Sequence, residues 1–318
     1  MSAKKNIYIV LKLLIIILSY TYIVYRLKKY DPGEIEFPTA ALNNINGILT
    51  LICVIMLMIL NWGAESLKWK LLVSKLEPVS FAVSVKAILS GITVSIFTPN
   101  RIGMFLGRIL VLSKVNRASA VFSTLAGSMS QLLITVIAGI AGTGLMIMVY
   151  PEKSFLGETN IYITGTLLFI FTGALIFLYL NISTLKIFLA IIPVVKKYEK
   201  YFRVLATYNT KELFIILLLS FFRYLVFVTQ FCILLILYNV DITLFQAIIS
   251  IAVTYFFMTF VPAITLFEAG VRGSVALFFI GIFSNGSIGI LTAYLTLWII
   301  NLAIPAIMGS AIIYRIKI

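Results

Sequence analysis

Residues Phe97 to Arg108 read Phe-Thr-Pro-Asn-Arg-Ile-Gly-Met-Phe-Leu-Gly-Arg and lie between two apolar runs. A proline, glycines and arginines are unusual together in so apolar a chain. Proline removes a backbone N–H donor and breaks a helix. In a membrane, such a break is tolerated only where the backbone is buried in protein or lies beside water. The stretch therefore predicts two helical segments joined by a break.

A second copy of this element spans Phe260 to Arg272 and reads Phe-Val-Pro-Ala-Ile-Thr-Leu-Phe-Glu-Ala-Gly-Val-Arg. Both copies follow the pattern Phe-x-Pro-x7-Gly, with an arginine just after the glycine. Upstream, the run Lys86 to Ser90 (Lys-Ala-Ile-Leu-Ser) is similar to Gln246 to Ser250 (Gln-Ala-Ile-Ile-Ser). We predict two related broken-helix elements, with structural breaks at Pro99, Gly103, Gly107, Pro262 and Gly270.

The composition is that of an integral membrane protein. Of 318 residues, 62% are hydrophobic and 11% charged, which excludes a soluble domain and predicts one membrane domain over 1–318. The net charge of +14 indicates contact with anionic lipid and a cytoplasmic excess of Lys and Arg, rather than nucleic acid. There is no histidine, and Cys53 and Cys232 lie in apolar runs that suggest buried reduced thiols. We expect no metal, no cofactor and no disulfide framework.

Apolar runs long enough to cross a bilayer predict an all-α polytopic fold. About six full spans are expected, together with two broken or re-entrant helix pairs, for eight to ten hydrophobic segments in all. The full spans are 6–26, 43–62, 118–149, 161–181, 214–237 and 287–312. The shorter pieces are 81–98 with 102–113, and 242–261 with 264–284.

The loops indicate the orientation. Segments 63–80 and 182–213 are rich in Lys and Arg and belong in the cytoplasm by the positive-inside rule. Both termini are then cytoplasmic, provided that each broken pair returns to the side where it started. The two elements enter from opposite faces and form an inverted repeat, about 43–150 and about 214–312, which is a recurrent transporter architecture. The alternative is four ordinary short helices with no transport site.

Charges within the apolar segments are costly and usually functional. Most of the charged candidates are cationic, and this excess of positive charge predicts an anionic ligand such as phosphate. Glu268 and Arg272, four residues apart, are expected to pair on one helical face. Thr98 and Asn100 offer side-chain bonds at the break, and helices that start after the prolines would present free N–H groups to an anion. The charged candidates are Lys86, Arg101, Arg108, Arg223, Glu268 and Arg272.

Each candidate has a structural alternative. Arg101 and Arg108 could extend to the membrane surface. Arg223, on one face with Ser220 and Gln230, could pair with a carbonyl or with Glu268. Two further segments are interpreted first as structural, one as a helix-packing face and the other as an interfacial anchor. These are the polar face Thr124, Ser128 and Gln131, and the segment 61–70, in which Glu65 could bond the tip of the broken pair.

The motifs resemble those of the lysylphosphatidylglycerol synthase transmembrane-region family, also called flippase-like domain proteins. The resemblance covers nearly the whole chain, but Met104 stands where the family pattern has an acidic residue. The family includes the flippase half of bacterial lysylphosphatidylglycerol synthases, so the resemblance implies lipid movement in the bacterial cytoplasmic (inner) membrane. The chain ends at Ile318 without the soluble aminoacyl-transfer domain, so synthase activity is not expected. The matching residues are 98–103 with Gly107 and Arg108, then 262–268 with Gly270 and Arg272, and more weakly 65–69.

Together these observations favour a lipid translocase that is not an enzyme. It would move an anionic or zwitterionic phospholipid, or a lipid-linked phosphate, between leaflets. The predicted headgroup site is Thr98, Asn100, Arg101, Arg108, Arg223, Glu268 and Arg272. The alternatives are a membrane-embedded enzyme acting on lipid phosphate and a non-transporting subunit that binds lipid. The sequence does not specify an oligomeric state.

Overall fold

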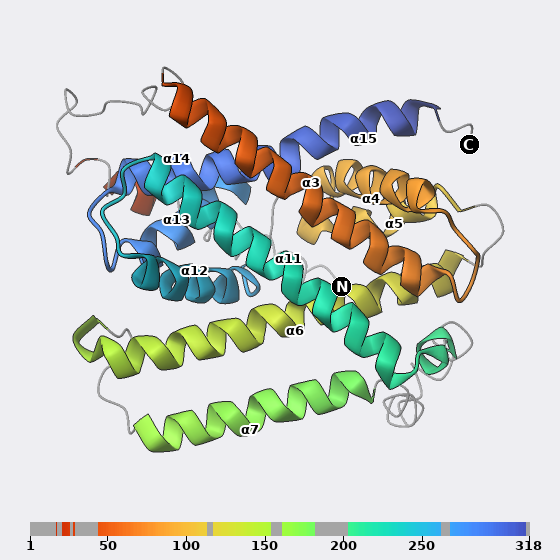
Figure 1. Cartoon of the computed structure of the whole chain (residues 1–318), viewed down its shortest axis with the longest axis horizontal. Helices are drawn as coiled ribbons and strands as arrows, with labels where there is room; N and C mark the ends of the chain where they lie inside the picture. The colour runs from red at the N-terminus through yellow and green to blue at the C-terminus, as the bar shows by residue number, and fades with distance from the viewer. Residues whose placement is uncertain are drawn as a thin grey trace, which may run out of the picture.

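The computed structural model describes residues 17, 21–25, 28, 44–112, 117–153, 161–181, 203–261 and 268–315. Every element in these ranges is helical (Figure 1). The longer helices are α3 (Ile45–Val73), α4 (Phe81–Ile96), α5 (Gly103–Ile109), α6 (Arg117–Val149), α7 (Ile161–Leu180), α11 (Thr210–Leu237), α12 (Leu244–Met258), α13 (Glu268–Ile280), α14 (Ser287–Trp298) and α15 (Ile304–Arg315). The short ones are η1 (Pro99–Arg101), η2 (Pro151–Lys153), η3 (Arg203–Thr207) and the π-helix η4 (Ile299–Ala303).

The all-α polytopic membrane fold is confirmed. Among the described helices, 4 are long and apolar enough to cross a bilayer: α3, α6, α11, and the continuous helix Ser287–Tyr314 that contains α14, η4 and most of α15. The fourth predicted span, 161–181, is the 20-residue helix α7. The predicted span 6–26 lies almost entirely outside the described residues. One boundary was wrong: α3 continues to Val73, so much of the predicted loop 63–80 is helix.

Helices α3 and α11 form an antiparallel pair at the centre of the molecule (Figure 1). Gln230 Nε2 of α11 donates to the carbonyl of Val54, near the start of α3. Near the other end, Lys68 Nζ of α3 donates to Ser220 Oγ. Residue numbers therefore fall along α11 as they rise along α3. This pair separates the short helices α4 and α5 from α12 and α13, which lie on opposite sides in Figure 1.

The first Phe-x-Pro element forms the predicted break. Helix α4 ends at Ile96, and the chain turns through Asn100 and Arg101, which have positive φ angles of 52° and 55°. Thr98 Oγ1 accepts the backbone N–H of Gly103 at 2.8 Å, which gives a partner to one of the free N–H groups at the start of α5. The second element cannot be compared in full, because residues 262–267, including Pro262, lie outside the described residues.

Two glycines bring α4 and α5 into close contact. A Cβ on Gly107 would lie 2.5 Å from the carbonyl oxygen of Ser90, and a Cβ on Gly91 would lie 2.8 Å from Cγ of Arg108. No other residue fits at Gly107 without a shift of the backbone. Small residues at such positions let membrane helices pack backbone to backbone. The turn and the close packing together fix where Arg101 and Arg108 project.

The two halves pack against each other reciprocally. Helix α4 packs on α15, and α12 packs on α6. A Cβ on Gly309 of α15 would lie 2.2 Å from the Leu89 carbonyl of α4, and a Cβ on Gly142 of α6 would lie 3.2 Å from the Ile249 carbonyl of α12. Leu89 and Ile249 hold equivalent places in the two similar runs upstream of the prolines. This equivalence supports the predicted repeat; its bounds and its orientation across the membrane stay predictions.

The end of α3 and the start of α11 lie at the same end of the molecule. Lys75 Nζ is 2.6 Å from Glu212 Oε1, and the hydroxyl of Tyr208 donates to the Leu72 carbonyl at 2.8 Å. Burial raises the pKa of Tyr208 to about 12, so this hydroxyl stays protonated as a donor. Residues 74–80 and 203–210 therefore face the same side, as the charge distribution predicts. That this side is cytoplasmic stays a prediction.

Candidate functional site: a cationic cavity between the helix pairs

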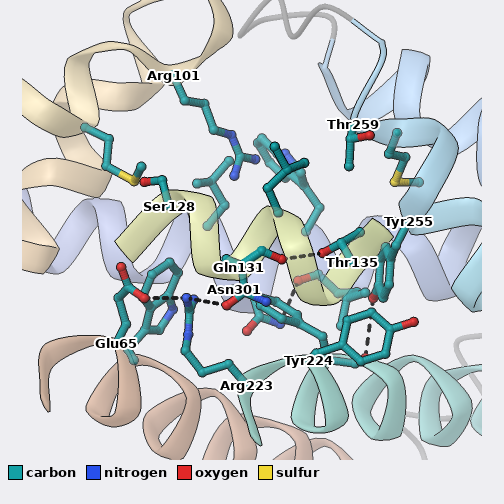
Figure 2. Close-up of a pocket in the computed structure, with 18 of the residues that line it drawn as sticks. Glu65, Arg101, Ser128, Gln131, Thr135, Arg223, Tyr224, Tyr255, Thr259 and Asn301 are labelled. Atoms are coloured by element: carbon teal, nitrogen blue, oxygen red, sulfur yellow. Dashed lines mark hydrogen bonds and ion pairs between the residues drawn. The ribbon is translucent and has the colours of Figure 1, made fainter. Parts of the chain in front are cut away.

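A cavity of about 390 Å³ lies beside the central helices (Figure 2). Side chains from both halves line it, including α3 and α5 from the first half and α11, α13 and α14 from the second. Five of these side chains are cationic: Lys68, Arg101, Arg108, Arg223 and Arg272. They are held in two ion-pair clusters, each built around one glutamate.

The Glu65 cluster consists of Glu65, Lys68, Arg108 and Arg223, all nearly fully buried. Glu65 Oε2 is 2.8 Å from Lys68 Nζ, one helical turn along α3, and it also accepts from Nη1 of Arg223. Glu65 Oε1 is 2.8 Å from Nη2 of Arg108, which comes from the broken pair. One carboxylate therefore serves three cations from three different helices. The cluster has more positive charge than its own carboxylate neutralises.

Neutral groups fix Arg223 in place. Its Nε donates to Asn61 Oδ1 at 2.8 Å. Its Nη1 donates to Gln131 Oε1 at 3.1 Å (Figure 2). Its guanidinium carbon also lies 5.3 Å from the ring centroid of Trp62 and 5.9 Å from that of Phe227. These contacts orient the guanidinium without removing its charge.

The Glu268 cluster consists of Arg101, Glu268 and Arg272. Arg101 binds Glu268 with two nitrogens: Nη2 is 2.6 Å from Oε1, and Nε is 3.2 Å from Oε2. Arg272 Nε is 3.1 Å from the same Oε1, which confirms the predicted pairing of residues four apart. Glu268 is buried, whereas the side chains of Arg101 and Arg272 are 32% and 24% exposed. In Figure 2 Arg101 extends into the cavity from the side opposite Glu65 and Arg223.

Met104, at the position where the family resemblance implies an acidic residue, contacts Arg108. Its Sδ accepts from Nη2 of Arg108 at 3.2 Å, so Arg108 has a neutral neighbour there. Arg108 Nε, which is buried, has no hydrogen-bond partner among the described residues. Of the described residues, Glu65 is the one carboxylate that lines the cavity. Buried charge requires compensation, so a cavity with this excess of cations favours an anionic ligand.

The structure brings most of the predicted site together but not all of it. Arg101, Arg108, Arg223 and Arg272 line one cavity, and Glu268 holds two of them. The other two predicted members have backbone roles: Thr98 accepts from the N–H of Gly103, and Asn100 forms the left-handed turn. Lys86, a charged candidate outside the predicted site, is exposed on α4.

Two members of the site were missed because of the boundary error in α3. Lys68 was interpreted as a cytoplasmic loop charge, but it is 1% exposed and ion-paired inside the protein. Glu65 was only a conjectured partner of the broken pair, but it is the centre of a cluster. The available signal was their i,i+3 spacing within an apolar run, which places both on one helical face.

Several of the alternative interpretations were also wrong. Arg108 is buried and does not extend to a membrane surface. Arg223 pairs with Glu65 rather than with Glu268. Trp69 is buried and donates to Thr124 Oγ1 at 3.1 Å, so segment 61–70 is core rather than an interfacial anchor. Cys53 was expected to be buried and is exposed.

Comparison with known proteins now decides the family. The model of the lysylphosphatidylglycerol synthase TM region family matches residues 9–309. The chain belongs to this family. The match covers nearly the whole chain, so both ion-pair clusters lie within the lysylphosphatidylglycerol synthase TM region. No curated protein and no solved structure matches the chain. Membership indicates an integral membrane protein with a lipid-related function.

Within the described residues, no group of three or more His, Cys, Asp or Glu side chains lies close enough to hold a metal ion. The two glutamates at the site are each engaged by several cations. In this arrangement the carboxylates position arginines, and the arginines are the groups that face the cavity.

Proposed function

We propose that this protein binds the phosphate-bearing headgroup of a membrane lipid in the cavity and moves it between the leaflets. The observation that carries the proposal is the excess of cations: five cationic side chains line the cavity, with two glutamates to hold them. Guanidinium groups bind phosphate oxygens through paired, charge-assisted hydrogen bonds. A phosphate would thus supply the charge that the cavity lacks.

The ion pair between Arg101 and Glu268 suggests how binding is coupled to movement. It joins the turn of the first broken pair to the first residue of α13 in the second. A phosphate that accepts from Arg101 competes with Glu268 for the same donors. Binding would therefore favour a state in which the two broken-helix pairs separate. The equilibrium between the joined and the separated state would shift by the difference in phosphate affinity between them. We propose that this separation opens the cavity toward the opposite leaflet.

A reconstitution experiment tests the proposal. The purified protein is placed in liposomes that contain a fluorescent phosphatidylglycerol, and movement of the headgroup between leaflets is followed over time. We expect movement above that of protein-free liposomes, with the lipid recovered unchanged by mass spectrometry. A modified lipid would instead indicate the membrane-embedded enzyme, and binding without movement would indicate a lipid-binding subunit.

The exposed residue Lys86 provides a matched control. Lys86→Gln removes one positive charge from α4, outside the cavity, so it tests whether total charge matters. We expect Lys86→Gln to retain headgroup movement, and Arg272→Gln to lose most of it. Equal effects of the two variants would contradict a site in the cavity.

A further inference from the structure

The cavity also contains polar groups that the phosphate hypothesis does not use. Four buried side-chain atoms on its lining have no hydrogen-bond partner among the described residues. They are Nε1 of Trp62, Nε1 of Trp298, the hydroxyl of Tyr224 and Oδ1 of Asn301. Two are N–H donors, one is an acceptor, and the hydroxyl can act as either. Buried groups of this kind are nearly always satisfied in native proteins, by ligand or water if not by protein.

Two of these groups, those of Asn301 and Tyr224, are held in place by their neighbours. Asn301 is 6% exposed, and its Nδ2 already donates to Gln230 Oε1 and to the Leu297 carbonyl, both at 3.2 Å. Those bonds leave Oδ1 available. Tyr224 is 7% exposed, and its ring packs edge-on against Tyr255. Tyr224 lies across the cavity from Arg101 in Figure 2.

A backbone irregularity places Asn301 on the lining. Asn301 is in the middle of the π-helix η4. Pro305 has no N–H to donate to the Asn301 carbonyl four residues earlier, which explains why the regular α-helical ladder is interrupted here. π-Helical turns inside α-helices are often found at functional sites. The widened turn and the unpaired amide oxygen are thus two separate observations at the same residue.

We propose that the headgroup is a polyol or sugar carried on the phosphate. This inference rests on the proposed function and adds the substrate class. Hydroxyl groups both donate and accept, so one polyol can satisfy indole N–H groups, a phenol and an amide oxygen together. The aromatic lining, which includes Tyr294 and Phe227, provides apolar surface for the C–H groups of a sugar ring.

Other common headgroups fit less well. A choline group makes no conventional hydrogen bonds and would leave the four groups unpaired, at the cost of buried polar atoms without partners. An aminoacylated headgroup would add positive charge to a cavity that already has an excess of it. The volume of about 390 Å³ is near the lower end of small-molecule sites, roughly 300–1,000 Å³, which suits a headgroup without its acyl chains.

Lipid affinity measured on the purified protein tests this inference. Three lipids with identical acyl chains are compared: phosphatidylinositol, phosphatidylmethanol and an uncharged glucosyl diacylglycerol. The first two carry the same phosphodiester charge, but only phosphatidylinositol has hydroxyls on its headgroup. We expect phosphatidylinositol to bind at least about ten-fold more tightly than phosphatidylmethanol, from two or more hydrogen bonds. We expect the glucosyl lipid to bind more weakly than either.

Two conservative variants locate the effect. Tyr224→Phe and Trp298→Phe each remove one unpaired polar group and keep an aromatic ring. Each should reduce the preference for phosphatidylinositol over phosphatidylmethanol by roughly 2- to 12-fold, the value of one hydrogen bond. The affinity for phosphatidylmethanol should change less than the affinity for phosphatidylinositol, because phosphatidylmethanol has no headgroup hydroxyl to lose a partner. Tyr150→Phe, which removes a hydroxyl at the end of α6 away from the cavity, is the matched control and should leave the preference unchanged.

The possible failures are distinguishable. Equal affinity for phosphatidylinositol and phosphatidylmethanol would overturn the polyol inference and leave the phosphate site standing. A preference that survives both aromatic variants would overturn the assignment of the hydroxyl-binding groups. No affinity of the folded protein for either phospholipid, or equally tight binding of the glucosyl lipid, would overturn the polyol phosphate and the proposed function together.

Discussion

Arg101 and Glu268 form a two-point ion pair between the two broken-helix elements, with Nη2–Oε1 at 2.6 Å and Nε–Oε2 at 3.2 Å. Arg101 lies in the left-handed turn that follows Pro99, and Glu268 is the first residue of α13. The pair therefore connects segments that are far apart in the sequence and that repeat the same motif. The ion pair also holds Arg101, whose side chain is partly exposed, against the cavity.

Removing Arg101 should destabilise the protein more than removing Arg272. When Arg272 is replaced, Glu268 still has its two-point ion pair with Arg101. When Arg101 is replaced, Glu268 has only its single contact with Nε of Arg272. We expect Arg101→Gln to lower the free energy of unfolding by roughly 1.5–3 kcal/mol and Arg272→Gln by less. Thermal unfolding in detergent of Arg101→Gln, Glu268→Gln and the double variant measures the coupling. Additive effects would show that these two residues do not pair.

Glu65→Gln should be among the most destabilising substitutions in the chain. It leaves three buried cations, Lys68, Arg108 and Arg223, without their common carboxylate. One-sided loss of a buried ion pair costs roughly 3–5 kcal/mol. Adding Lys68→Met should restore part of the stability, because it removes one uncompensated charge and keeps an unbranched side chain. Wild-type stability of the single variant would mean that Glu65 is not the counter-charge of these cations.

The glycine contact between α4 and α5 gives a prediction with an internal control. Gly107→Ala places a Cβ 2.5 Å from the Ser90 carbonyl oxygen, and we expect it to cost about 1–3 kcal/mol as an overpacked contact. Gly144→Ala in α6 meets no atom within 4 Å, so it should be neutral or stabilising by up to about 1 kcal/mol from helix propensity. Chemical or thermal unfolding compares them. If the two substitutions had the same effect, α4 and α5 would not pack as described.

The side on which the charged segments lie is open to labelling. Ser74 and Thr210 are exposed and lie at the same end of the molecule. We expect cysteines at either position, in a background that lacks Cys53 and Cys232, to resist a membrane-impermeant thiol reagent in intact cells and to react in inverted vesicles. The reason is the Lys and Arg excess of these segments. Labelling from outside at both positions would reverse the topology, and labelling at only one would contradict the shared face.

The sequence predicted the elements of this fold better than their contacts. The apolar runs located α6 and α11 closely, and Pro99 located the end of α4, because each of these signals is local. The end of α3 was missed because Lys68 is polar in sequence but is neutralised by Glu65 after folding. Periodicity shows which residues share a helix face and gives no information on which helix lies opposite. For that reason Arg223 was a candidate from the sequence and its partner was not.

The same limit applies to the groups that line the cavity. Asn301 and Trp298 are ordinary residues in an apolar run, and only the fold places their polar atoms without partners beside five cations. The pair Glu268–Arg272 was predictable because both residues lie on one helix, whereas Arg101–Glu268 required the packing of two elements. The second break at Pro262 stays a prediction, since it lies outside the described residues.

The central claim is that the cavity cations bind the lipid phosphate, and headgroup movement in proteoliposomes tests it most directly. Rates are measured for fluorescent phosphatidylglycerol and phosphatidylcholine at matched protein amounts, with wild type, Arg101→Gln and the exposed control Lys86→Gln. We predict that Arg101→Gln slows phosphatidylglycerol about ten-fold or more, slows phosphatidylcholine less, and that Lys86→Gln changes neither, because the lost interaction is charge-assisted. The claim would be contradicted if Arg101→Gln moved phosphatidylglycerol as fast as the wild type, or if the wild type moved none.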